Sequence, residues 1–511
     1  RGNTQLADAK ESKGTGAGMY FTFSNEQQEA VTAKIGLSYT SVENARINLQ
    51  AEAEGKTFED AKEQAHQIWQ EYLGRIEVET SKREDKVKFY TGLYHALLGR
   101  GLANDVNGAY PRNDGSVGQL PMKEGKPQYN VYNTDAAWGA QWNLSQLWTL
   151  AYPEYMSEYV SSHIQAYKDA GWLADGLANN RYVSGVGTNL LSTIIAGAYQ
   201  CGIRDFDTKL AYEACLKNEL DGKDRPFGAG KVNTAEFVKY GYVPHQDQGE
   251  GYHETFMFSA SHTLEYSYSA WAVAQWAKSL GDTENYDKLM NLSKGWERLY
   301  DTSCNFIRPK KADGKFVDNF NPMEVWRGFQ EGNAWQYTFY VPHDVKGLAR
   351  LMGGQKKFID KLQMVFDKGY YDPANEPDIA YPYLFSYFKG EEWRTQKTVR
   401  ELLAKYFTPK PDGIPGNDDA GTMSAWAVFS MMGFYPDCPG VPEYTLTDPT
   451  FDRITIRLNP EFYGKDKLVI EKKENGSPEG YIQKIELGGK KTGYRINHND
   501  LVKGGTLTFY K

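Results

Sequence analysis

The sequence has few cysteines, and none lies in a motif with a known chemical role. Its four cysteines are Cys201, Cys215, Cys304 and Cys438, and no two of them form a CxxC pair. Thiolate zinc sites and redox dithiols use such close pairs, so neither is expected here. Cys201 and Cys215 could form a disulfide, but buried free thiols are the preferred interpretation.

Long apolar runs and clusters of basic residues are also absent. No apolar run approaches the roughly 20 residues needed to span a bilayer, so no membrane span is expected. The 58 Lys and Arg residues are outnumbered by 66 Asp and Glu and form no basic stripe, so nucleic acid is not an expected partner. The chain begins at Arg1 without an apolar signal segment, which we interpret as a processed product of a periplasmic or extracellular protein.

Aromatic residues are the class present in excess, at 14% of the chain with 36 Tyr and 12 Trp. The C–H faces of pyranose sugars pack on aromatic rings, and sugar hydroxyls need polar partners, which Tyr and Trp also supply. A carbohydrate site is one explanation of the excess, and a large helical core is the other.

The first 83 residues read as two regions. Residues 1–50 contain alternating apolar and polar positions, clearest at 19–23 and 33–39, which predict the last strands of a β-domain. Residues 51–83 read as a helical linker, in which Thr57 caps a helix and Asp60 is the acidic partner.

Residues 84–438 predict a helical domain, because apolar residues recur at helical spacing between loops rich in Gly, Pro and Asn. The expected helices are 85–100, 135–151, 153–170, 188–202, 207–218, 261–280, 283–302, 333–351, 355–368, 393–406 and 419–434. About a dozen sequential helices favour a ring of helical hairpins, the (α/α)6 toroid. Residues 439–511 return to strand patterns and predict a small β-module that packs with the N-terminal strands. The expected fold class is mainly α.

An acidic turn precedes the last expected helix, in the segment Gly416-Asn417-Asp418-Asp419. Carboxylates at a helix N-terminus are favoured and kept ionised by the exposed N–H groups. A helix cap explains one Asp, but two adjacent acids with Asn417 exceed that need. An ionised Asp419 is suited to activating a water molecule, and Asn417 and Asp418 are candidates for binding substrate.

A second candidate is Glu265, near the start of an expected helix and beside an apolar stripe that includes Leu264 and Tyr268. A Glu among aromatic side chains is poorly solvated and has a raised pKa, as a general acid near neutral pH needs. The alternative is a surface Glu in a first helical turn.

Two further segments carry oxygen ligands and aromatic rings. In Glu331-Gly332-Asn333-Ala334-Trp335-Gln336-Tyr337, Glu331 and Asn333 are hard ligands of the kind that Ca²⁺ takes, Trp335 is a platform for a sugar, and Gln336 is a polar contact. A capped, buried helix start is the alternative. Asn375-Glu376-Pro377-Asp378 is a loop whose acid Glu376 suits substrate binding, and an ordinary turn is the alternative there.

Histidine-based chemistry has little support. The chain has 8 His and no GxSxG nucleophile motif. His245 with Asp247 and Glu250, and the pair His253-Glu254, lie in one loop, but such pairs are too common to specify zinc.

Taken in chain order, these segments resemble glycoside hydrolase family 92, the calcium-dependent exo-acting α-mannosidases. The matching stretches are Lys88 to His95, Gly171-Trp172-Leu173, Thr263-Leu264-Glu265-Tyr266, Glu331 to Tyr337, Asn375-Glu376-Pro377, Trp393-Arg394-Thr395-Gln396 and Gly416 to Trp426. The resemblance implies a β-sandwich, of which only the tail is present, followed by an (α/α)6 domain. It also implies a glycan substrate and cleavage with inversion.

The same resemblance assigns roles to individual residues. Glu265 falls on the general acid and Asp419 on the general base, which inverting enzymes hold roughly 6.5–9.5 Å apart to admit water. Glu331, Asn333 and Asp419 fall near a calcium ion that orients the sugar.

The chain also departs from the family pattern. Family members typically read Leu-Trp-Asp where this chain has Ala137-Trp138-Gly139, which leaves Trp138 as a substrate contact but removes an acid. Asn189 and Leu191 stand where the family often has His and Asp, and Asn417 where many members have Asp. A shifted sugar preference, or binding of glycan without cleavage, is therefore the alternative to an active α-mannosidase.

Overall fold

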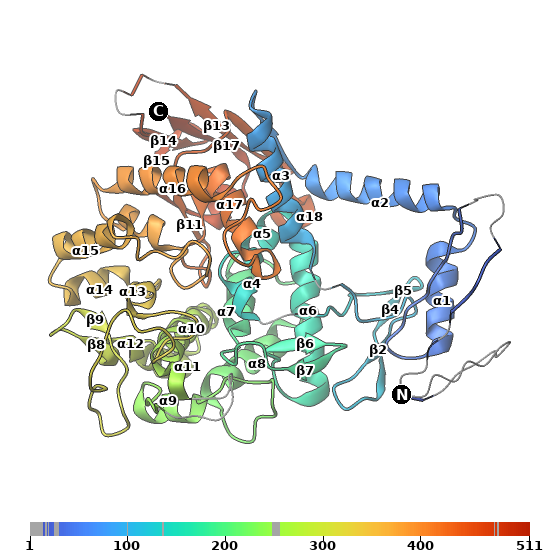
Figure 1. The fold of residues 1–511 in the computed structure, drawn as a ribbon, viewed down its shortest axis with the longest axis horizontal. Coiled ribbons are helices and arrows are strands. Elements are labelled where there is room, and N and C mark those ends of the chain that lie inside the picture. The colour runs from blue at the N-terminus through green and yellow to red at the C-terminus, as the bar shows by residue number, and fades with distance from the viewer. Residues whose placement is uncertain are drawn as a thin grey trace.

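The computed structural model describes residues 14, 15, 18, 20–24, 30–99, 101–134, 137–247, 256–474, 476, 477 and 480–511. Helices dominate the chain up to residue 432, and strands follow (Figure 1). The α-helices are α1 Val42–Ala53, α2 Phe58–Leu73, α3 Arg83–Leu97, α4 Ala137–Gln141, α5 Leu144–Ala151, α6 Pro153–Ala170, α7 Leu191–Gln200, α8 Thr208–Leu220, α9 Thr234–Tyr240, α10 Ser259–Leu280, α11 Thr283–Leu292, α12 Gly295–Leu299, α13 Ala334–Tyr337, α14 Val345–Leu351, α15 Gln355–Asp367, α16 Glu392–Tyr406, α17 Thr422–Met432, α18 Pro460–Tyr463 and α19 His498–Leu501. Short 3-10 helices are η1 Phe256–Phe258, η2 Tyr381–Tyr387 and η3 Asp419–Gly421.

The helices from α3 to α17 close into a ring, because the first and the last of them pack together. Gly92 of α3 permits a close approach, since a Cβ there would lie 3.2 Å from the carbonyl oxygen of Ser424 on α17. α10 packs against α7, α8, α11 and α12, and almost all of it is buried. The mainly α fold predicted from helical spacing is confirmed, with expected segments such as 135–151 each split into two helices.

The C-terminal strands form the sheet at the top of Figure 1. Its order is β1-β12-β13-β17-β14-β15, with β1 Ile76–Glu79, β12 Arg453–Arg457, β13 Lys467–Lys473, β17 Gly505–Tyr510, β14 Lys484–Leu487 and β15 Lys490–Thr492. β1 pairs antiparallel with β12, and Ile76 lies opposite Ile456. The β-module therefore pairs with a strand from the linker, and not with strands from residues 19–50 as expected.

Smaller sheets hold the loops of the ring and join the module to it. β10 Phe434–Tyr435, β11 Glu443–Leu446 and β16 Arg495–Asn497 form one of them. The two-stranded pairs are β2 Ala109–Pro111 with β3 Val117–Gln119, β4 Met122–Lys123 with β5 Lys126–Pro127, β6 Gly176–Ala178 with β7 Arg181–Val183, and β8 Tyr300–Asp301 with β9 Phe306–Ile307.

The prediction of strands across residues 19–50 was wrong for the described residues of that range, because none of residues 20–24 and 30–50 lies in a strand. Residues 42–53 form helix α1, and the side chain of Ser41 caps it by accepting from the backbone N–H of Asn44, 3.0 Å away. A strand needs a partner, and residues 30–41 have none among the described residues. Met19, part of the same expected strand, lies outside those residues.

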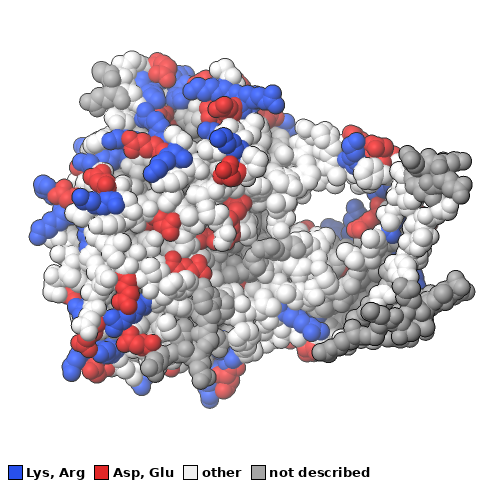
Figure 2. Space-filling model, in the orientation of Figure 1, with Lys and Arg blue, Asp and Glu red and all other residues white. Residues whose placement is uncertain are grey.

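The linker helix α2 was predicted correctly, including its capping box between Thr57 and Asp60. α1 and α2 form an arm that leaves the ring on the right of Figure 1, and Figure 2 shows an opening between this arm and the body. Within the described part of the chain, no helix is long and apolar enough to cross a bilayer. The four cysteines are free, as expected, and Cys201 and Cys215 are buried.

Candidate active site

Glu265 is buried on α10, with 1% of its surface exposed. One carboxyl oxygen, Oε1, accepts a hydrogen bond of 2.9 Å from the indole Nε1 of Trp138. Oε2 has no hydrogen-bond partner within the described residues. Burial raises the pKa of Glu265 to about 7, although the bond from Trp138 acts in the opposite direction. The group therefore holds a proton near neutral pH, as predicted from its aromatic surroundings.

Helix α4 connects Glu265 to the acidic turn. Trp138 of α4 contacts Glu265, and its neighbour Gly139 lies against Asp419, because a Cβ at Gly139 would be 3.2 Å from the carbonyl oxygen of Asp419. The hydroxyl of Thr422 donates to the carbonyl oxygen of Gly139 over 2.9 Å. Two consecutive residues of α4 thus contact the carboxyl of Glu265 and the backbone of Asp419.

The two adjacent carboxylates of the acidic turn, Asp418 and Asp419, have different surroundings. Asp418 accepts from the backbone N–H of Ser424 over 2.9 Å and from its hydroxyl over 3.0 Å, which satisfies the start of α17. Asp419 and Ala420 both have left-handed backbones, with φ of 45° and 61°. Side chains rarely adopt this conformation outside functional sites or tight turns. Asp418 therefore satisfies the first turn of α17, whose N-cap position is Gly421, and Asp419 is available for another role.

Glu376 adds a third carboxyl to this region. It is fully buried, and its carboxyl lies within hydrogen-bonding reach of that of Asp419, but neither oxygen makes a well-aligned hydrogen bond within the described residues. Burial raises its pKa well above the ordinary value, and the negative charges of Asp419 and Glu331 raise it further. Acidic side chains are also visible at the centre of the face in Figure 2, with most basic ones at its edge.

Among the described residues, no group of three or more His, Cys, Asp or Glu side chains is arranged to hold a metal ion. Ca²⁺, however, also takes carbonyl and water oxygens. The two unpartnered oxygens of buried Glu376, beside Asp419 and Glu331, are hard ligands with a charge that a cation would offset, so the residues fit such an ion.

The segment 331–337 has a stronger structural role than the sequence indicated. Asn333 caps α13, and with Gln336 it forms a capping box. The ring of Trp335 packs edge-on against Phe306, with 4.8 Å between ring centroids. It also packs against Tyr370 in a tilted arrangement, with centroids 4.5 Å apart. These contacts favour the alternative of a capped helix start, so we retain only Glu331, which has a left-handed φ of 53°, as a site residue of this segment.

Sequence patterns missed several polar groups in the wall of the site. Burial raises the pKa of the Tyr340 hydroxyl well above its ordinary value, and the charge of nearby Glu265 raises it further. The ring of Tyr340 lies 4.6 Å from that of Trp142. Within the described residues, hydrogen-bond partners are missing for the hydroxyl of Tyr340, the indole N–H of Trp142 and both amide atoms of Gln141. Trp142 also packs edge-on against Trp138. For Gln141, on α4, and Trp142, just after it, only the position close to Trp138 in the sequence could have indicated a role in the site. Tyr340 had no such signal.

The remaining expected residues are more peripheral. Asn417 is exposed, and no described contact assigns it a role. Asn189 donates from its amide to the carbonyl oxygen of Leu173 over 2.9 Å. His245 is hydrogen-bonded to Ser259 and Asp247. Glu250, His253 and Glu254 lie outside the described residues.

A comparison with known families identifies the chain. The sequence pattern of the glycosyl hydrolase family 92 catalytic domain matches residues 44–510. The chain belongs to glycosyl hydrolase family 92. The family 92 chain is 28% identical, over 96% of its length, to an uncharacterized secreted glycosidase of Arthroderma benhamiae, and covers 62% of that protein.

Solved structures of the family share the fold. A family 92 α-mannosidase from Bacteroides thetaiotaomicron superimposes with a TM-score of 0.81 at 26% identity, over 93% of this chain and 61% of the other. A family 92 inverting mannosidase from B. thetaiotaomicron gives a TM-score of 0.82 at 28% identity, over 93% and 65%. The chain therefore spans less than two thirds of the length of these relatives.

Proposed function

We propose that this family 92 chain is an inverting, exo-acting glycoside hydrolase that releases terminal α-linked mannose, or a related sugar, from glycans. The observation that carries the proposal is a buried Glu265 with a pKa of about 7, held by Trp138, whose neighbour Gly139 lies against the backbone of the acidic turn at Asp419. The similar solved structures are mannosidases of the same family, which supports mannose as the sugar.

The two carboxyls differ in environment, which separates their roles. Glu265, kept protonated by burial, donates its proton to the glycosidic oxygen as the bond to the leaving sugar breaks. Asp419 accepts a proton from a water molecule as that water attacks the anomeric carbon from the opposite face. Trp138 holds the Glu265 carboxyl in place through its indole N–H.

We also propose that Glu376 and Asp419, together with carbonyl and water oxygens, hold a Ca²⁺ ion in the region whose charge Glu331 adds to. When bound, the ion would act as a template and Lewis acid toward sugar hydroxyls. The unpartnered carboxyl oxygens of Glu376 support this assignment. The alternative function is binding of glycan without cleavage, which the missing side chain at Gly139 favours.

The test is turnover of a panel of α-mannobioses and aryl α-mannosides, with the anomeric configuration of the first product followed by NMR. Release of β-mannose from an α-linkage supports an inverting hydrolase. Binding of the disaccharides without turnover supports the alternative, and release of α-mannose contradicts inversion.

We further propose that residues 1–50 belong with a β-sandwich, 51–83 form a linker, 84–438 form the catalytic domain and 439–511 form the β-module. Exposed apolar side chains near the arm support a β-sheet partner for it: Tyr20, Phe21, Phe23, Ile35 and Leu37 are each at least 62% exposed. A periplasmic or extracellular location for this chain agrees with the similarity to the secreted fungal glycosidase.

A further inference from the structure

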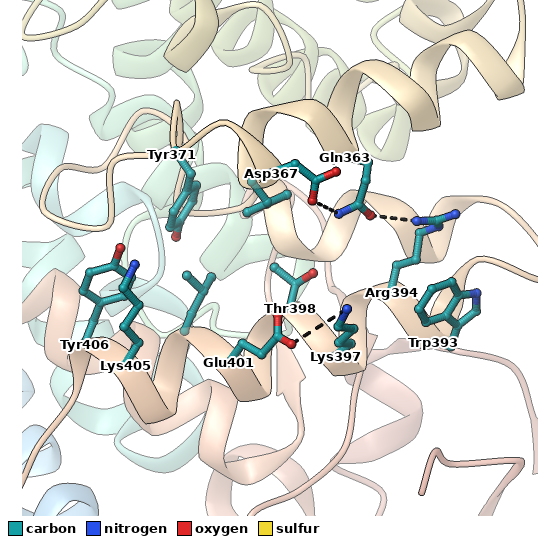
Figure 3. Close-up of a pocket in the computed structure, with 13 residues that line it drawn as sticks. Gln363, Asp367, Tyr371, Trp393, Arg394, Lys397, Thr398, Glu401, Lys405 and Tyr406 are labelled. Atoms are coloured by element: carbon teal, nitrogen blue, oxygen red, sulfur yellow. Dashed lines mark hydrogen bonds and ion pairs between the residues drawn. The ribbon is translucent and has the colours of Figure 1, made fainter. Parts of the chain in front are cut away.

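A groove of about 440 Å³ lies between α15 and α16, and its lining shares no residue with the candidate active site (Figure 3). Its volume is within the range of roughly 300–1,000 Å³ that is typical of pockets for small ligands. The family assignment and the proposed hydrolysis give this groove no role.

Aromatic side chains stand at both ends of the groove. Trp393 of α16 lies at one end, with 37% of its surface exposed, and Tyr371 and Tyr406 face each other at the other end (Figure 3). Their rings offer apolar faces and edges to a ligand that lies along the groove, and each carries a polar group as well.

Polar side chains lie between these ends, and their charges are largely compensated within the protein. The amide of Gln363 donates to Asp367 over 2.9 Å and accepts from Arg394 over 2.7 Å, which connects α15 to α16. Lys397 lies 3.8 Å from Glu401. The groove thus presents both donors and acceptors without a strong net charge.

This chemistry selects among ligand classes. A phosphate or other anion needs several converging cations, but Arg394 and Lys397 already face acids or amides. The third cation of the lining, Lys405, lies over the ring of Tyr406 at 4.6 Å. An apolar peptide would bury these polar groups without partners, at a cost in free energy. A neutral ligand rich in hydroxyls, with apolar C–H faces at its ends, satisfies both the aromatic ends and the polar middle.

We propose that the groove between α15 and α16 is a second binding site for a neutral oligosaccharide. Tyr371 in its wall directly precedes the loop that contains Asp372 and Glu376, and the backbone N–H of Asp372 donates to the carboxylate of Asp378 over 3.0 Å. A polymer held in the groove would therefore lie on the same part of the ring as that loop. Binding here does not require that the chain cleave the sugar, so this proposal can hold if the hydrolase proposal fails.

The test measures hydrogen exchange of peptides covering residues 363–371 and 393–406, with mannotriose added to the intact Glu265→Gln variant. We expect mannotriose to slow exchange in both peptides. Trp393→Ala should weaken this effect about three- to tenfold in apparent affinity, the amount expected for one aromatic contact. Met364→Ala, on α15 with 42% exposure but outside the lining, should leave the effect unchanged.

Three results would overturn the proposal: no slowing of exchange in these peptides, equal slowing by inorganic phosphate, or equal weakening in Met364→Ala and Trp393→Ala. Turnover separates this site from the active site. If the wild type is active, Trp393→Ala should keep its rate on aryl mannosides and lose rate on branched mannan. If the wild type is inactive but mannotriose protects the groove, the second site stands without the hydrolase.

Discussion

Glu265 is a single residue whose surroundings set its proton affinity. With a pKa of about 7, it loses its proton as the pH rises through neutrality. A general acid must be protonated to act, so we predict that kcat/KM on mannobiose falls as the pH rises through about 7. Glu265→Gln should lower kcat/KM by about 10²–10⁴-fold, the usual contribution of such a group, and should remove this limb of the pH profile.

The leaving group distinguishes an acid from a residue that only shapes the site. Dinitrophenyl mannoside has a leaving group that needs no proton, so Glu265→Gln should affect it much less than mannobiose. An equal loss on both substrates would contradict the assignment of Glu265 as the acid.

The raised pKa of Glu265 also makes the free energy of unfolding depend on pH, in a direction that can be stated. Its folded pKa of about 7 exceeds the ordinary value of 4.5, so the folded protein binds this proton more tightly than the unfolded chain. The resulting stabilisation is present below pH 4.5 and is lost as the pH rises through about 7, by at most about 3 kcal/mol. We predict that Glu265→Gln removes this dependence when unfolding free energies are measured in denaturant between pH 5 and 8.

Gln141 is a buried amide that lies beside the Tyr340 hydroxyl but makes no well-aligned hydrogen bond to the described residues, which is costly unless a ligand or water uses it. We predict that Gln141→Met changes the unfolding free energy by less than about 1 kcal/mol but lowers kcat/KM by roughly 10–100-fold, because a sugar hydroxyl loses its partner. Gln146→Met is the matched control, since Gln146 is buried nearby but donates to the carbonyl oxygen of Pro439. Equal kinetic losses in the two variants would contradict a role in substrate binding.

At the scale of elements, the start of α17 separates stability from catalysis. Asp418 bonds twice to Ser424 of the first helical turn, so Asp418→Ala should destabilise the fold by about 1 kcal/mol, as expected for a lost cap. Asp419→Asn keeps a residue that tolerates a left-handed backbone, so we predict unchanged stability and activity lowered by at least 10²-fold. Thermal unfolding and turnover measured on both variants check this division.

Two results would contradict the separate roles assigned to Asp418 and Asp419. If Asp419→Asn retains activity on mannobiose and on activated aryl mannosides, Asp419 is not the base. If Asp418→Ala loses activity without losing stability, the two adjacent acids have exchanged roles.

Element positions followed from the sequence where local signals were complete. Thr57 with Asp60 marked the start of α2, and the periodic apolar residues of α10 gave nearly its full extent. Alternation at 33–39 was misleading, because period-2 patterns predict a strand only when a partner strand is available. The left-handed turn at Asp419 and Ala420 has no such pattern, since only tertiary contacts stabilise it.

For the molecule as a whole, the site could be predicted by residue type but not by arrangement. Trp138 and Glu265 are 127 residues apart, and Gly139 and Thr422 are 283 apart, so closure of the ring brings them together. Carboxyl groups suited to acid and base roles were visible in the sequence. The unpartnered polar atoms of Gln141 and Tyr340 were not, because a missing hydrogen bond exists only in the folded protein.

Calcium should couple the site to the stability of the whole ring. A ligand that binds only the folded state at 100 times its Kd adds about 2.7 kcal/mol to the unfolding free energy. After chelation, we predict that saturating Ca²⁺ raises the melting temperature by several degrees in calorimetry and restores activity. Glu376→Gln should abolish both effects, whereas Glu284→Gln, an exposed carboxylate on α11, should leave both unchanged.

The pH dependence of this effect has a sign set by Glu376. Its pKa lies well above the ordinary value without a cation, and Ca²⁺ requires the ionised form. The ion must therefore displace a proton, so the affinity for Ca²⁺ should rise with pH, and binding should release protons to the buffer. Calorimetric titration in buffers of different ionisation enthalpy measures that release. Binding without proton release, or with equal affinity in Glu376→Gln, would place the ion elsewhere.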